Sequence, residues 1–110
     1  MKVLAVVADL LFRSRIEAHL TRLAVPYRVV APDELGTALA AEKPTHVVVN
    51  LAEVAAEDLG RLEGFSGRTL GFGPHVDRER FLAARHAGVQ VVANSALERR
   101  LAAWLDRKDG

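Results

Sequence analysis

The sequence predicts a single α/β domain built on one parallel β-sheet of five strands. Five short apolar segments alternate along the chain with five segments of helical character. The apolar segments are short and continuous, which is typical of strands covered on both faces. Alternation of strand and helix favours parallel pairing with right-handed crossovers. A length of 110 residues suits one domain with one core.

The predicted strands are rich in valine, which favours extended backbone. The first is a continuous apolar run that Asp9 interrupts. A buried strand explains this run better than an export signal, because no small-residue cleavage site follows it. The five predicted strands cover residues 3–8, 27–30, 46–49, 69–72 and 89–93.

The first two predicted helices carry apolar residues at helical spacing. Pro26 ends the first, residues 11–24, before the second strand, and Pro44 follows the second, residues 33–42. The stripe of the first helix that should face the sheet consists of Phe12, Ile16, Leu20 and Leu23.

Three further helices complete the alternation. Glycines within and after residues 52–62 predict a short, loose third helix. Asp77 can cap the fourth helix, residues 78–87, and Gly88 can stop it. Ser95 can cap the last helix. The buried stripe of that helix is expected to consist of Leu97, Leu101, Trp104 and Leu105.

The composition is that of an ordinary globular domain. A net charge of +1 gives no electrostatic reason to expect nucleic acid or a membrane as a partner. No apolar run approaches the ~20 residues of a membrane span. The absence of cysteine excludes disulfides, thiolate metal sites and cysteine nucleophiles. We therefore expect a cytoplasmic protein with a domain at residues 1–105 and a frayed tail at 106–110.

Polar residues follow several of the predicted strands. Asp9, Asn50, the Gly-Phe-Gly-Pro-His turn at residues 71–75 and the pair Asn94 and Ser95 all stand at strand ends. Ligands of open parallel sheets bind beyond the carboxyl ends of the strands. This edge is therefore where function should be sought.

Three stretches resemble response-regulator receiver domains. Residues 43–51, Lys-Pro-Thr-His-Val-Val-Val-Asn-Leu, are similar to the receiver pattern of Lys-Pro-Asp, an apolar run, Asp and an apolar residue. Residues 72–77, Phe-Gly-Pro-His-Val-Asp, and the later Ala-Gly-Val at 87–89 are similar to the fourth strand, fourth helix and start of the fifth strand. Together with residues 9–16, they also resemble a stand-alone, divergent pseudo-receiver subgroup. The likeness implies a doubly wound, flavodoxin-like (βα)5 sheet with strand order 2-1-3-4-5.

The same resemblance implies where an active site would be. Active receivers carry two acids after the first strand, a phosphorylated aspartate after the third, a hydroxyl residue after the fourth and a lysine after the fifth. The acid pair corresponds here to Ala8 and Asp9. The phosphorylated aspartate corresponds to Asn50, the hydroxyl residue to Gly73 and the lysine to Ser95.

These replacements remove the phosphotransfer chemistry. The amide of Asn50 is neutral and a poor nucleophile, so it cannot form an acyl phosphate. Mg²⁺ is usually bound by one or two carboxylates together with phosphate oxygens, so the single carboxylate of Asp9 makes a poor Mg²⁺ site. Without a lysine at Ser95, no charge from the fifth strand neutralises a phosphoryl group.

The leading hypothesis is a phosphorylation-incompetent pseudo-receiver of bacterial two-component or phosphorelay signalling, which is not an enzyme and has no cofactor or metal. It would act through contacts with an unidentified protein, such as a signalling protein. Receivers commonly dimerise through the fourth helix, fifth strand and fifth helix. By analogy, this face is expected to meet a partner or a second copy, with exposed candidates Arg80, Arg85, Arg99 and Arg100.

The alternative hypothesis is an anion or small-ligand binding protein that uses the same crevice. Its polar groups would be Asn50, His75, Asn94 and Ser95, together with backbone amides at helix starts. An enzyme is the weakest hypothesis, because no catalytic constellation can be assembled at the strand ends.

Structural roles compete with these functional ones. Asp9 is expected to cap the first helix or bond to the opposite loop, and Asn50 to lock the third loop through backbone bonds. His75 and Asp77 are too few ligands for a metal, and Asp77 suits a cap better. The lone Trp104 is expected in the core or a subunit interface.

Overall fold

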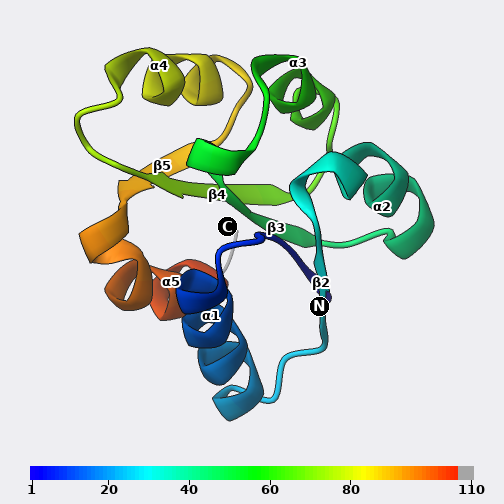
Figure 1. Ribbon diagram of the computed structural model, residues 1–110. Helices are drawn as coiled ribbons and strands as arrows, with labels where there is room; N and C mark the ends of the chain where they lie inside the picture. Colours follow the sequence, from blue (N-terminus) through cyan, green and yellow to red (C-terminus); the bar gives the residue numbers. More distant parts are fainter. Residues whose placement is uncertain (107–110) are drawn as a thin grey trace.

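A computed structural model describes residues 1–106 and contains one parallel sheet. Its five strands lie in the predicted order β2-β1-β3-β4-β5 (Figure 1). Because every neighbouring pair is parallel, the carboxyl ends of all strands meet along one edge of the sheet. The strands are β1 (Val3–Val6), β2 (Tyr27–Val30), β3 (His46–Asn50), β4 (Arg68–Gly73) and β5 (Gln90–Ala93).

Helices link consecutive strands and cover both faces of the sheet, which confirms the doubly wound (βα)5 architecture. Helices α1 and α5 lie on one face, and α2, α3 and α4 lie on the other (Figure 1). No helix in residues 1–106 is long and apolar enough to cross a membrane. The helices are α1 (Leu10–Arg22), α2 (Leu35–Glu42), α3 (Ala56–Leu59), α4 (Arg78–His86) and α5 (Leu97–Asp106).

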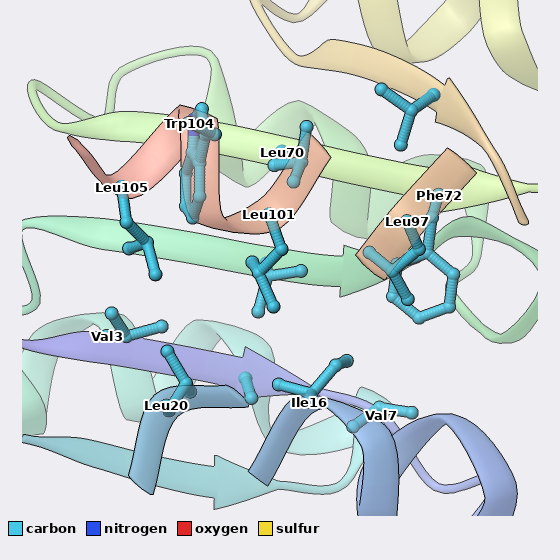
Figure 2. Close-up of a cluster of buried hydrophobic side chains, with 13 residues drawn as sticks. Val3, Val7, Ile16, Leu20, Leu70, Phe72, Leu97, Leu101, Trp104 and Leu105 are labelled. Carbon is cyan, nitrogen blue, oxygen red and sulfur yellow. The ribbon is translucent and has the colours of Figure 1, made fainter. Parts of the chain in front are cut away.

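The central strands are buried on both faces, as their continuous apolar sequences predict. In β1, Val3 and Ala5 face α1 and α5, whereas Leu4 and Val6 face the opposite helices. The predicted stripe of α5 is buried throughout. Figure 2 shows its side chains packed with Val3, Ile16 and Leu70 between the helices and the sheet.

Trp104 belongs to this core, which excludes a ligand platform. It is 3% exposed, and its ring meets that of His46 edge-on at a centroid distance of 5.1 Å. Arg68 lies over the indole ring, and its Nη1 donates a hydrogen bond of 2.9 Å to the Trp104 carbonyl. These contacts join the end of α5 to the first residues of β3 and β4.

Two details of the predicted helices are wrong. Leu23 is 45% exposed, because α1 ends at Arg22 and the chain turns away before the stripe is complete. Ser95 does not cap α5. It lies inside a 3₁₀ turn, Asn94–Ala96, where the Asn94 carbonyl accepts the Leu97 N–H and the turn runs directly into the helix.

The third crossover is short and loose, as predicted. A 3₁₀ turn at Leu51–Glu53 precedes the single turn of α3, and a second 3₁₀ turn at Gly60–Leu62 follows it.

Helix α5 extends to Asp106, one residue into the predicted tail. The rest of that prediction, residues 107–110, lies outside the described residues.

An ion pair joins the start of β1 to the end of α2. Lys2 Nζ lies 2.6 Å from Glu42 Oε1, and Arg28 lies 3.8 Å from the second carboxylate oxygen. The hydrogen bond from Lys2 and the charges of Lys2 and Arg28 hold the pKa of Glu42 below its usual value. This contact lies at the edge opposite the candidate site.

The end of α1 places a residue other than glycine in the left-handed region. Ala24 has φ of 56°, while its N–H bonds the Thr21 carbonyl and the Val25 N–H bonds the Leu20 carbonyl. These bonds satisfy helix-end carbonyls, and glycine is the usual residue there. The turn is therefore made at a backbone cost.

We predict that Ala24→Gly raises the free energy of unfolding by about 0.5–1 kcal/mol, because glycine adopts this conformation without steric penalty. Ala18→Gly is the matched control, since Ala18 is exposed within α1, and it should lower stability by about 1 kcal/mol. Urea denaturation measures both. Equal destabilisation by the two substitutions would contradict the assignment of the left-handed turn.

Candidate functional site

The strand ends bring the predicted site residues to one edge of the sheet. Register pairs Val6 with Val49 in the β1–β3 ladder, and Asn50 with Phe72 in the β3–β4 ladder. Gly73, at the end of β4, pairs with Ala93 of β5. The loops after β1, β3, β4 and β5 therefore lie along one edge of the sheet, and this edge is called the strand-end site below.

Asn50 locks the loop that follows β3. The residue is only 4% exposed. Its Oδ1 accepts a hydrogen bond of 3.2 Å from the Ala52 N–H, and its Nδ2 donates one of 2.8 Å to Glu53 Oε1. Both ends of the amide are engaged, which confirms the predicted structural role of Asn50.

Glu53 bridges two loops of the strand-end site, and its role was not predicted from the sequence. Its Oε1 accepts the bond from Asn50 and a second bond, of 2.9 Å, from the Ala8 N–H in the loop after β1. One carboxylate oxygen thus links two loops that are 45 residues apart in sequence. The spacing Asn-x-x-Glu at the start of a turn resembles a capping box and was the available signal.

Asp9 caps α1, as its structural interpretation predicted. Its Oδ1 accepts hydrogen bonds of 2.9 Å from the Leu11 N–H and 3.2 Å from the Phe12 N–H. Among residues 1–106, no group of three or more His, Cys, Asp or Glu side chains is arranged to hold a metal ion. Asp9 therefore satisfies the helix end, and the described part of the site supplies no acidic metal cluster around it.

The end of β4 is packed with apolar side chains where a receiver carries a hydroxyl. A Cβ atom built on Gly73 would lie 3.2 Å from Phe81 Cε1 and 3.5 Å from Leu51 Cβ. A Cβ atom built on Gly71 would lie 2.9 Å from Leu51 Cδ2. Glycine at these two positions lets the fully buried Leu51 pack directly on the strand.

The end of β5 contributes little to a phosphoryl site. Ser95 is exposed, and Asn94 is partly buried. Asn94 Oδ1 is buried and has no hydrogen-bond partner among the described residues.

His75 is exposed on the turn after β4, and Asp77 caps α4 by accepting the Arg80 N–H at 3.4 Å, as predicted. No hydrogen bond joins Asn50, His75, Asn94 and Ser95 into one constellation in the part of the chain that is described.

Arg80 is not the exposed contact residue that the sequence suggested. It is partly buried, and its Nη1 donates to the carbonyls of Leu51, at 2.8 Å, and Val54, at 2.6 Å. Its Nε lies 3.2 Å from Asp77 Oδ2. Arg80 thus holds the Glu53 turn from the side of α4. The other three candidates, Arg85, Arg99 and Arg100, are exposed.

Comparison with known proteins gives no family assignment. No model of a known protein family matches the chain, and no curated protein sequence matches it significantly. The likeness to receivers therefore stands on the fold and on the residues described above.

We predict that Glu53→Ala lowers the free energy of unfolding by about 1–3 kcal/mol, because it leaves the Asn50 amide and the Ala8 N–H without their acceptor. Glu57→Ala is the matched control. Glu57 is exposed in α3, four residues later, and its loss should cost less than about 0.5 kcal/mol. Chemical denaturation measures both, and equal effects would show that Glu53 is an ordinary surface carboxylate.

Proposed function

We propose that this protein is a receiver-like signalling module that cannot be phosphorylated on aspartate and acts through contacts with other proteins. The observation that carries the proposal is the Ala8–Glu53–Asn50 contact, in which a carboxylate of the chain itself takes up the hydrogen-bond donors at the ends of β1 and β3. We further propose that the module acts in the bacterial cytoplasm and catalyses no reaction.

The chemistry of Asn50 supports the loss of phosphotransfer. A side-chain amide is a poor nucleophile, and both polar ends of this amide already bond within the loop. To attack an incoming phosphorus atom, Asn50 would first have to break these bonds inside a buried site. Neither its chemistry nor its setting favours reaction.

The charges at the strand-end site also support the loss of phosphotransfer. The Glu53 carboxylate would repel the oxygens of a phosphoryl group at short range. No lysine stands at Ser95 to offset this repulsion, and apolar packing around Gly73 takes the place of a hydroxyl residue. These features act against phosphate binding as well as against phosphate transfer.

The same charge weakens the alternative proposal of an anion-binding crevice. An anion at the Ala8 N–H would have to displace Glu53 from both of its donors. Asn94 Oδ1 is an unpaired acceptor, which suits a hydrogen-bond donor better than an anion. A small-ligand binder would still reveal itself by raising the melting temperature, by mass action.

We predict that incubation with acetyl phosphate and Mg²⁺ leaves the intact mass of the folded protein unchanged, because no carboxylate stands at position 50. A receiver domain that retains its aspartate, treated in the same reaction, is the positive control. Stoichiometric addition of one phosphate to this chain would overturn the proposed function. Digestion and peptide mass analysis would then locate the acceptor.

A further inference from the structure

Helix α4 presents one face that nothing in residues 1–106 covers. Arg78, Leu82 and Arg85 follow one another at spacings of four and three residues, so they share a side of the helix. All three are exposed, and Leu82 is 54% exposed. In Figure 1, α4 lies at the outer edge of its layer, beside α3. The face defined by Arg78, Leu82 and Arg85 is called the α4 face below.

The α4 face borders a hollow with an apolar floor. The hollow has a volume of ≈ 420 Å³ and is lined by His75, Arg78, Phe81, Leu82 and Arg85. Phe81 is anchored in the core below α4. Val76, in the loop that leads into the helix, is 75% exposed. Covering Leu82 and Val76 would remove apolar surface from water and would favour association.

The rim of the hollow is positively charged. Arg78 and Arg85 form no ion pair with any carboxylate of the described residues, in contrast to Arg80 on the flank that faces α3. The acidic residues near α4, Asp77 and Glu79, line a separate hollow on that same flank. Charge is therefore segregated across the helix, with unpaired cations on the α4 face.

We propose that the α4 face binds an acidic, amphipathic protein segment that inserts an apolar side chain over Leu82. Arg78 and Arg85 lie about 10 Å apart along the helix axis, from the rise of 1.5 Å per residue. A partner helix with acidic residues seven positions apart and an apolar residue between them matches this spacing. The inference rests on the proposed function, because it names the surface and the partner class for a module that acts by contact.

The test is selection from a displayed library of helical peptides against the full chain. Enriched peptides should combine acidic residues with an apolar or aromatic anchor. Their binding should weaken by about tenfold or more in the double variant Arg78→Glu/Arg85→Glu, and also at high salt. The variant Arg15→Glu/Arg22→Glu is the control, because it makes the same charge change on two exposed residues of α1, which are also seven positions apart but lie on the opposite face of the sheet, and it should leave binding unchanged. Thermal melts verify that both variants are folded.

Several results would overturn the inference. These are failure to enrich peptides, enrichment of peptides without acidic residues, and equal loss of binding in the α1 control. A dimer that Leu82→Asp disrupts would assign the α4 face to a second copy. Binding to anionic lipid vesicles that the α4 double variant abolishes would assign it to a membrane. None of these results bears on phosphorylation, which the intact mass after acetyl phosphate treatment reports separately.

Discussion

The Glu53 carboxylate connects the loop that follows β1 to the end of β3. On one side it accepts the Ala8 N–H from the loop after β1, and on the other it accepts the buried amide of Asn50. The turn that carries it is held from α4 by Arg80, through the carbonyls of Leu51 and Val54. The loops at the carboxyl ends of β1 and β3 and the first turns of α4 thus form one bonded unit. Because each donor in this partly buried network has its acceptor, the network favours a single arrangement of the loops.

This arrangement distinguishes the strand-end site from the surface that we propose for binding. At the strand-end site, Asn50 and Glu53 bond to each other and apolar side chains fill the space around Gly73. On the α4 face, arginine side chains remain unpaired within the described chain, and Leu82 stays in water. Charged side chains without an ion pair and apolar side chains in water gain most free energy from contact with another molecule. The Arg80 clamp holds α4 in place, so the α4 face is preformed.

Local patterns were sufficient to predict the architecture but not the site. Continuous valine runs and the stripe that ends in Leu105 specify which residues are buried, and Asp9 and Asp77 lie directly before the helices that they cap. Ser95 failed as a cap because the Asn94 carbonyl bonds the Leu97 N–H in its place. The roles of Glu53 and Arg80 depend on partners 45 and 29 residues away, which only the folded chain brings within reach. Asn50, at the position where the resemblance to receivers implies an aspartate, was visible in the sequence, whereas the bonding of the Glu53 carboxylate to two loops was not.

The most direct test of the account is a nuclear magnetic resonance titration of the folded protein with Mg²⁺ and inorganic phosphate. The reporters are the Ala8 backbone amide and the Asn50 side-chain amide, because both donate to Glu53. If Glu53 keeps both donors engaged, neither signal should show a saturable shift with either solute alone or with both present. A saturable, phosphate-dependent shift of these two signals would contradict the account, because it would place the ligand where the structure places Glu53.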